Sequence, residues 1–226
     1  GGKAAALNAG LLEMKTDVVV ALDADTVFLP DTIRLLVAHF ADPDVAAVAG
    51  NAKVGNRQRV LTRLQALEYI TSQNLDRRAF DLMNCITVVP GAVGAWHRGR
   101  VLAAGGYHVD TLAEDSDLTI RLLRDGYRVA YEDRAIALTE APETLGQFLK
   151  QRFRWMFGML QVSFKHLGAM KLRDSKAVGL IALPNILVFQ LLFSLVAPVA
   201  DLVAFGILVD LAWDAATGAL RVAAGG

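Results

Sequence analysis

Hydrophobic and polar positions follow two different periods along residues 1–143, and each change of period marks an expected element. Continuous apolar runs rich in β-branched residues predict strands, and apolar residues that recur every three or four positions predict helices. Helices are expected at residues 3–14, 30–41, 58–83 and 115–124. Strands are expected at residues 17–22, 45–54, 86–96, 128–132 and 135–139, with Pro90-Gly91 dividing the third into two short strands. This alternation predicts an α/β fold with a largely parallel sheet, in which residues 17–22 form a buried parallel strand.

The segment from residue 144 to 167 has the pattern of an amphipathic helix. One side is apolar and rich in aromatic rings: Phe148, Leu149, Phe153, Met156, Phe157 and Leu160. The polar side is basic: Lys150, Arg152, Arg154 and Lys165. A basic amphipathic helix with aromatic side chains can lie in a membrane interface. The alternative is an ordinary helix that faces a protein core, and the apolar run that follows favours the interface.

No charged residue occurs from Ala177 to Ala200. As a helix this run would extend roughly 36 Å at about 1.5 Å per residue, enough to cross a hydrocarbon core of about 30 Å. The residues before it are basic: Lys165, Lys171, Arg173 and Lys176. Positive charge is enriched on the cytoplasmic side of membranes, so this flank and the α/β region are expected in the cytoplasm, at the inner membrane of the cell.

A second apolar stretch, residues 202–213, is interrupted by Asp210. It predicts either the start of a returning span or a loop followed by a truncated helix. The chain is therefore expected to have three parts. These are an α/β domain at residues 1–143, an interface helix at 144–176 and a transmembrane region at 177–226.

Charge and cysteine content exclude two classes of protein. The 226 residues contain 23 Lys and Arg and 23 Asp and Glu, so the formal net charge is zero. A nucleic-acid-binding protein usually shows a basic excess, so no nucleic-acid partner is expected. The single cysteine, Cys85, excludes an internal disulfide and a multi-cysteine metal site.

Asp23 and Asp25 follow the expected strand at 17–22. Ligands bind beyond the carboxyl ends of strands in open α/β sheets, and residues two apart in extended backbone point the same way. Two carboxylates at such an edge would suit Mg²⁺ or Mn²⁺ holding a diphosphate. The alternative is a solvated turn, because Asp favours turns.

Glu114 and Asp115 open the expected helix at 115–124. Acids at this position stabilise a helix by capping and through its dipole. The functional alternative is a general base that accepts the proton of an attacking hydroxyl.

Gln151, Arg154 and Trp155 share one face of the helix at 144–167, and Arg152 points elsewhere. Arginine can hold phosphate in a bidentate fork, and tryptophan offers a ring face to a sugar. The alternative is a core Trp155 with arginines that reach lipid headgroups.

Two further segments carry candidate binding residues. Lys3 and Asn8 flank the start of a helix after a glycine pair, and Lys3 could meet a phosphate or a nucleotide base; otherwise it is an exposed lysine. The segment Pro90-Gly91-Ala92-Val93-Gly94 is rich in small residues, which allow a ligand to approach the backbone closely. The alternative for this segment is a tight turn in the sheet.

Taken together, these motifs resemble the processive inverting family 2 glycosyltransferases, which include cellulose, chitin and hyaluronan synthases. The likeness is greatest to the bacterial poly-N-acetylglucosamine synthase type and runs from Gly1 to about Ala200. The matching segments are Gly2-Lys3-Ala4-Ala5-Ala6-Leu7-Asn8, Asp23-Ala24-Asp25, Gly50-Asn51, Asn56-Arg57, Pro90-Gly91-Ala92, Glu114-Asp115 and Gln151-Arg152-Phe153-Arg154-Trp155. The Gln-x-x-Arg-Trp pattern is the specific part, since it separates processive synthases from most single-transfer relatives.

The resemblance implies a GT-A fold, in which helices flank a mixed sheet, followed by an interface helix and one or more transmembrane helices. It implies a membrane-bound enzyme that transfers a sugar, N-acetylglucosamine, from a UDP-sugar to a growing β-linked polysaccharide with inversion. Mg²⁺ or Mn²⁺ would be the cofactor. The partners would be the donor, the polysaccharide acceptor, the lipid bilayer and accessory membrane subunits.

The resemblance also assigns roles to residues. Asp115 would be the catalytic base, with Glu114 beside it in contact with substrate. Asp25 and Asp23 would serve the metal and the diphosphate. Lys3 would touch the nucleotide, Asn8 would be a further substrate-binding residue, and Pro90, Gly91 and Ala92 would line the acceptor entrance. Gln151, Arg154 and Trp155 would hold the acceptor end and the diphosphate.

In two places the chain departs from the family pattern. The family's first strand and its nucleotide-binding acid would precede Gly1, so the chain is expected to be a fragment that lacks part of the nucleotide site. Ala113 stands where several relatives carry Thr, with little expected effect. Two other functions remain open: a single-transfer glycosyltransferase that acts on a lipid or other acceptor, and a catalytically silent membrane assembly subunit.

Overall fold

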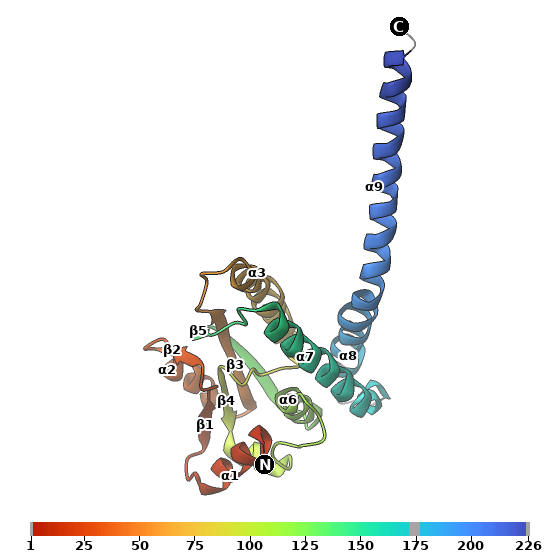
Figure 1. Cartoon of the computed structure of the whole chain (residues 1–226). Helices are drawn as coiled ribbons and strands as arrows, with labels where there is room; N and C mark the ends of the chain where they lie inside the picture. Colours follow the sequence, from red (N-terminus) through yellow and green to blue (C-terminus); the bar gives the residue numbers. More distant parts are fainter. Residues whose placement is uncertain (1, 172–176, 225–226) are drawn as a thin grey trace. The chain divides into compact units, whose positions relative to one another are not determined.

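The computed structural model describes residues 2–171 and 177–224. It contains two compact units, Gly1–Pro184 and Asn185–Gly226. The first unit holds a five-stranded sheet with helices on both faces (Figure 1). Its strands are β1 (Val18–Ala21), β2 (Thr26–Phe28), β3 (Val45–Val54), β4 (Gly94–His97) and β5 (Arg128–Thr139). Their order across the sheet is β1-β4-β3-β5-β2.

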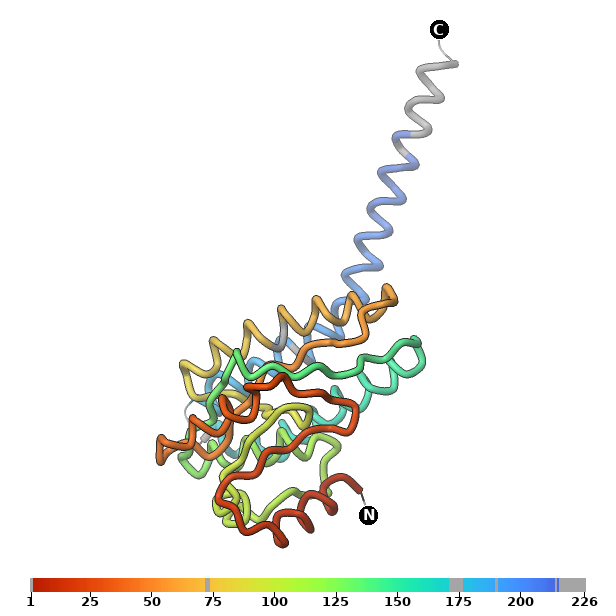
Figure 2. The backbone as a smooth tube through the Cα atoms, turned by 90° about the vertical axis from the view of Figure 1, so that its left-hand side faces the viewer, coloured from red at the N-terminus to blue at the C-terminus, as the bar shows by residue number. Residues whose placement is uncertain are grey.

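Most expected helices are present within a few residues of their predicted bounds. The helices of the first unit are α1 (Lys3–Glu13), α2 (Thr32–Ala38), η1 (His39–Ala41), α3 (Val60–Glu68), η2 (Tyr69–Leu75), α4 (Asp76–Leu82), α5 (Arg98–Ala103), α6 (Glu114–Arg124), α7 (Leu145–Lys165), η3 (Leu167–Lys171) and η4 (Val178–Ala182). Figure 2 shows α3, η2 and α4 as one helical run, as the pattern at 58–83 predicts. Thr144 caps α7, because its hydroxyl accepts a hydrogen bond from the Gln147 backbone N–H at 3.3 Å.

The sheet is mixed, so the prediction of a largely parallel sheet is wrong. Only β3 and β5 pair in parallel, while β1–β4, β3–β4 and β2–β5 are antiparallel. The prediction that residues 17–22 form a buried parallel strand is also wrong, since β1 lies at the edge of the sheet and is half-buried along its length. A run of valines is compatible with either direction of pairing, because the direction depends on the neighbouring strand.

The prediction of two strands within residues 86–96 is half right. Only β4 is a strand, and the preceding residues form a buried loop with a turn at Pro90, where Val93 N–H donates to the Pro90 carbonyl at 3.1 Å. Val89 N–H donates to the Thr119 hydroxyl of α6 at 3.1 Å. This side-chain partner lets the loop stay buried without a strand neighbour.

The strands expected at 128–132 and 135–139 are one strand, β5, with a bulge. Gly50 of β3 pairs with Glu132, but Asn51 pairs with Ile136, so residues 133–135 are extra. The polar residues that suggested a break in the pattern therefore lie in the bulge.

Each face of the sheet buries its own core. Alternate residues of β5 point to opposite faces, so Tyr131 joins one core and Ala130 the other. The first core includes Leu11 of α1, Leu118 of α6 and Val162 of α7, and the second includes Leu36 of α2. The first core therefore carries the three helices whose residues are the main functional candidates.

The second unit consists of helix, in which η5 (Ile186–Leu192) leads into α9 (Phe193–Ala224). A short helix, α8 (Leu183–Asn185), precedes η5. Because α9 passes through Asp210 without interruption, both predictions for residues 202–213, a returning span and a loop, are wrong. Among the described residues, one helical stretch, Val178–Trp213, is long and apolar enough to cross a membrane, with a mean hydropathy of 2.3. Arg173 and Lys176, which enter the predicted orientation, lie outside the described residues.

Candidate active site

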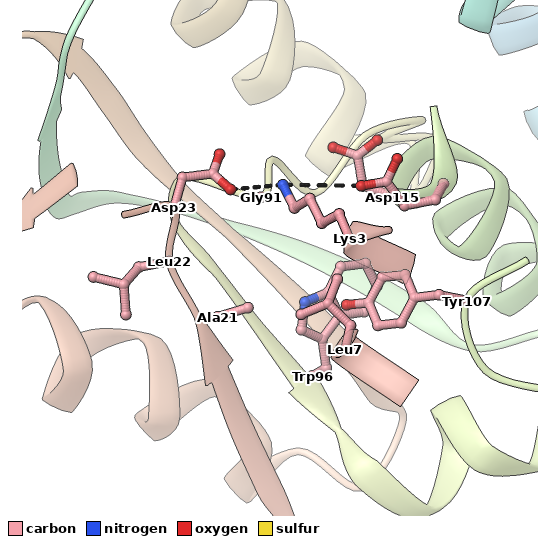
Figure 3. A pocket seen from close by; sticks show the side chains of 10 residues that line it. Lys3, Leu7, Ala21, Leu22, Asp23, Gly91, Trp96, Tyr107 and Asp115 are labelled. Atoms are coloured by element: carbon pink, nitrogen blue, oxygen red, sulfur yellow. Dashed lines mark hydrogen bonds and ion pairs between the residues drawn. The ribbon is translucent and has the colours of Figure 1, made fainter. Parts of the chain in front are cut away.

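Residues from four distant segments line one small pocket in the first unit (Figure 3). Lys3 comes from the first turn of α1, Asp23 follows β1, Gly91 lies in the turn before β4, and Glu114 and Asp115 open α6. The complete lining is Lys3, Leu7, Ala21, Leu22, Asp23, Gly91, Trp96, Tyr107, Glu114 and Asp115. Five of the predicted site residues therefore meet in one place.

Lys3 joins the acidic groups of this pocket. Its Nζ lies 2.6 Å from Asp23 Oδ1 and 3.8 Å from Glu114 Oε1. Partial burial opposes the charge on Lys3, but the neighbouring carboxylates outweigh it and raise the pKa of Lys3 above its ordinary value. A Cβ atom at Gly91 would collide with Lys3 Nζ, so glycine at this position leaves the space that the ammonium group occupies.

The carboxyl of Asp115 has an altered pKa because of its surroundings. Burial raises the pKa of its carboxyl, and the charge of Glu114 raises it further. In the opposite direction, Ser116 N–H donates to Asp115 Oδ1 at 2.8 Å, and this bond orients the carboxylate at the helix N-terminus. A raised pKa brings a carboxylate closer to the proton affinity that a base needs.

Tyr107 and Trp96 form an aromatic wall of the pocket. Their ring centroids are 6.0 Å apart with an interplanar angle of 75°, an edge-to-face pair. Tyr107 lies outside the sequence motifs that predict site residues. The only sequence signal was its position after Gly105-Gly106 and shortly before Glu114.

Asn8, a predicted substrate residue, lies outside the pocket lining. Its side-chain amide donates to the Tyr107 carbonyl and accepts from the Tyr107 N–H, both at 2.8 Å. In this structure Asn8 therefore holds the aromatic wall in place.

Asp25 is exposed and, unlike Asp23, does not line the pocket. The chain turns at Ala24–Asp25 between β1 and β2, so the extended backbone expected to align the two carboxylates is absent at this point. The Asp25 carboxylate accepts a hydrogen bond from the Thr26 hydroxyl at 3.3 Å. Its assignment to the metal stays a prediction.

Gln151, Arg154 and Trp155 lie on α7, and none of them lines the pocket. Arg154 is exposed, Trp155 is half-buried against the second core, and Gln151 Oε1 is buried without a partner among the described residues. Arg152 makes more side-chain contacts than its place in the motif suggests. Its guanidinium pairs with Glu68 and lies 4.7 Å from the ring centroid of Trp155 and 4.8 Å from that of Phe148.

The face of α7 that carries Gln151 packs against the segment that leads into Glu114. Gly158, seven residues after Gln151, lies so close to Ala113 that an added Cβ would be 2.9 Å from the Ala113 Cβ. Two helical turns correspond to about 11 Å along the axis, so Gln151 lies on the same side of α7 as Gly158, about 11 Å away along the helix.

A second group of ligand-type side chains lies outside this pocket. One ligand atom each of His108, Asp110 and Asp117 lies within 4.8 Å of the others, a spacing that could hold a metal ion.

Comparison with known proteins agrees with the motifs. A family model described as glycosyl transferase family group 2 matches residues 18–216. The poly-β-1,6-N-acetyl-D-glucosamine synthase of Staphylococcus aureus is 34% identical over 158 residues, which are 70% of this chain and 38% of that protein. The synthase of the same name from Staphylococcus epidermidis is 32% identical over the same length. The chain thus spans about two fifths of the length of these curated relatives.

The fold has a solved counterpart. A mannosyltransferase from Pyrobaculum calidifontis, solved with GDP-Man and Mn²⁺, matches with a TM-score of 0.65 and 24% sequence identity. The match covers 93% of this chain and 60% of that one. This likeness confirms the expected GT-A-like fold, a mixed sheet with flanking helices.

Proposed function

Because the chain belongs to glycosyl transferase family group 2, we propose that it is the catalytic part of a membrane-bound polysaccharide synthase. It transfers N-acetylglucosamine from a UDP-sugar to a growing β-linked polymer with inversion. The observation that carries the proposal is the convergence of Lys3, Asp23, Glu114 and Asp115 in one pocket. The choice of sugar rests on the Staphylococcus synthases.

Asp115 takes the proton from the acceptor hydroxyl as its oxygen attacks the anomeric carbon of the donor. The bond from that carbon to the diphosphate breaks on the opposite face, so an α-linked donor gives a β-linked product. A carboxylate is a weak base for an alcohol, and it therefore works by position and by transfer concerted with attack.

A hard divalent cation would bind at the carboxylates of this region. Carboxylate oxygens are the ligands that Mg²⁺ and Mn²⁺ prefer, and the Asp23 carboxylate lies at the pocket, with Asp25 on the adjoining turn. When bound, the ion would neutralise charge on the departing diphosphate. Lys3 adds a fixed positive charge to the same region.

The acceptor would be held by α7. Arg154 and Trp155 can contact phosphate and sugar rings from the helix face described above, with Gln151 one turn earlier and Pro90 to Ala92 at the entrance. The apolar stretch Val178–Trp213 would anchor the enzyme in the cytoplasmic membrane with the catalytic domain in the cytoplasm, where accessory membrane subunits could join it.

A single-transfer enzyme is the second candidate, because Gln151, Arg154 and Trp155 do not line the pocket in this structure. Such an enzyme would add one sugar to a lipid or another acceptor. The length of the product separates the two candidates.

The test uses membranes from cells that express the protein, with radiolabelled UDP-N-acetylglucosamine and UDP-glucose supplied separately in Mg²⁺. We expect high-mass label from UDP-N-acetylglucosamine only, and its loss in Asp115→Asn. Glu13→Gln, an exposed acid at the end of α1, is the matched control. Label only in a small or lipid-extractable product would establish the single-transfer enzyme, and polymer made by Asp115→Asn would remove the base assignment.

A further inference from the structure

Lys165, at the C-terminal end of α7, uses all three hydrogens of its ammonium group. Its Nζ lies 2.8 Å from Asp117 Oδ1, 2.9 Å from Asp110 Oδ1 and 3.1 Å from His108 Nδ1. An ammonium group has three donors and no acceptor, so His108 Nδ1 accepts the hydrogen bond from Lys165. The ligand-type group His108–Asp110–Asp117 therefore already surrounds a cation, the side chain of Lys165.

Asp117 is the fully buried centre of this cluster, with no exposed surface. Arg121 Nε lies 2.9 Å from its Oδ2, and His166 Nε2 lies 2.9 Å from its Oδ1. Since Arg124 donates to His166 Nδ1 at 2.9 Å and cannot accept, the His166 proton lies on Nε2 and points at Asp117. Burial alone would raise the pKa of Asp117, but the hydrogen bonds from His166 and Lys165 outweigh it and hold that pKa well below its ordinary value.

The cluster extends to the pocket wall. Arg121 also donates to the carbonyls of Ala104 and Gly106, the latter at 2.7 Å. Gly106 precedes Tyr107, whose ring lines the pocket. The buried charges thus connect α6, the end of α7 and the aromatic wall.

Three residues of α7 contact the segment around Asp115. Gly158 touches Ala113, Gln161 Oε1 accepts from Leu112 N–H at 3.0 Å, and Lys165 binds Asp110 and Asp117. Positions 158, 161 and 165 recur at helical spacing and so lie on one face of α7. Residues 110–117, which include Glu114 and Asp115, are therefore fastened along a single rigid helix.

We propose that Lys165 is a positioning residue that fixes the catalytic segment on α7, and thereby sets the spacing between the base Asp115 and the acceptor face of the same helix. The inference rests on the proposed function, because the spacing matters only if α7 holds the acceptor. Lys165 does not line the pocket, so we expect its loss to affect donor binding much less than transfer.

The activity test compares Lys165→Met with Lys15→Met, a matched change at an exposed lysine after α1. A misplaced base or acceptor should slow sugar transfer to polymer roughly 100-fold. Water does not bind α7, so hydrolysis of the UDP-sugar to UDP and free sugar should fall much less than transfer, and the KM for the donor should change little. Equal loss of transfer and hydrolysis would overturn the positioning role.

A second measurement does not depend on catalysis. Amide hydrogen exchange within residues 108–117 should become at least ~10-fold faster in Lys165→Met while α1 and β3 exchange as in the wild type. If Lys165→Met loses its fold, the milder Asp110→Asn should show the same pattern at smaller amplitude. Unchanged exchange at residues 108–117 in a folded variant would overturn the positioning role of Lys165. If the wild-type protein neither transfers nor hydrolyses either sugar, the proposed function fails. The exchange rates alone then show whether Lys165 holds residues 108–117 on α7.

Discussion

Glu114 and Asp115 are adjacent, but their surroundings give the two carboxyls different chemistry. Burial, and then the charge of Glu114, raises the pKa of Asp115. A base with a raised pKa becomes protonated at a higher pH than an ordinary aspartate, so transfer should fail on the acid side. Glu114→Gln removes the neighbouring negative charge, and the acid limb of kcat/KM against pH should therefore move to lower pH.

The control for this experiment is again Glu13→Gln, far from the pocket lining. An acid limb that stays at the same pH in Glu114→Gln would mean that another group controls it. A limb that moves to higher pH would show that Glu114 assists Asp115 through Lys3 instead of opposing its charge.

At the residue scale, the sequence was sufficient to predict the pocket residues that belong to short local motifs. Lys3, Asp23, Gly91 and the Glu114–Asp115 pair were selected from short motifs, and they line one pocket. Asn8 and Tyr107 lie 99 positions apart and meet through a side-chain–backbone hydrogen bond. Such a contact has no periodicity, so the sequence could not indicate that Asn8 supports Tyr107.

Helices α6 and α7 make an element-scale contact that depends on a missing side chain. A Cβ at Gly158 would lie 2.9 Å from the Ala113 Cβ and 3.0 Å from its backbone nitrogen, and backbone cannot rotate away. We expect Gly158→Ala to destabilise the fold by about 1–3 kcal/mol, measured by denaturant unfolding in detergent.

Gly146→Ala on the same helix is the matched control, since nothing lies within 4 Å of its added Cβ. Alanine favours helix at both positions, so the difference between the two variants isolates the packing contact. Equal stability of the two variants would show that α7 can move away from α6 without cost.

The elements themselves were easier to predict than their pairing. The bounds of β3 match the predicted residues 45–54, because hydrophobic runs locate a strand. The direction of β1 and the bulge of β5 were missed, since both depend on a partner strand far away in the sequence.

The whole chain combines a polar pocket with a stretch suited to lipid. Val178–Trp213 is predominantly apolar, and its large apolar side chains from Phe193 onward are exposed in this structure. Long apolar helices of this kind partition into bilayers. We expect the expressed protein to stay in the membrane pellet after alkaline carbonate extraction, with the catalytic domain open to protease only from the cytoplasmic side. Release into the carbonate supernatant would show that the stretch is covered by protein instead of lipid.

The membrane-length stretch was predictable because composition alone sets it. Its continuity was not, since Asp210 reads as an interruption in the sequence and yet lies within α9. One charged residue costs a helix little when its side chain can reach a polar environment, so a single acid is weak support for a helix end.

The Gln-x-x-Arg-Trp pattern leaves the second position open, but in this chain Arg152 is constrained from three sides. Its guanidinium meets Glu68 while lying over the rings of Phe148 and Trp155. Only a planar guanidinium can lie flat on a ring and form a two-pronged salt bridge at the same time, whereas a lysine ammonium acts as a point charge. The motif allows any residue at this position, but the contacts of Arg152 in this chain require arginine. A lysine there would be a severe substitution despite its equal charge.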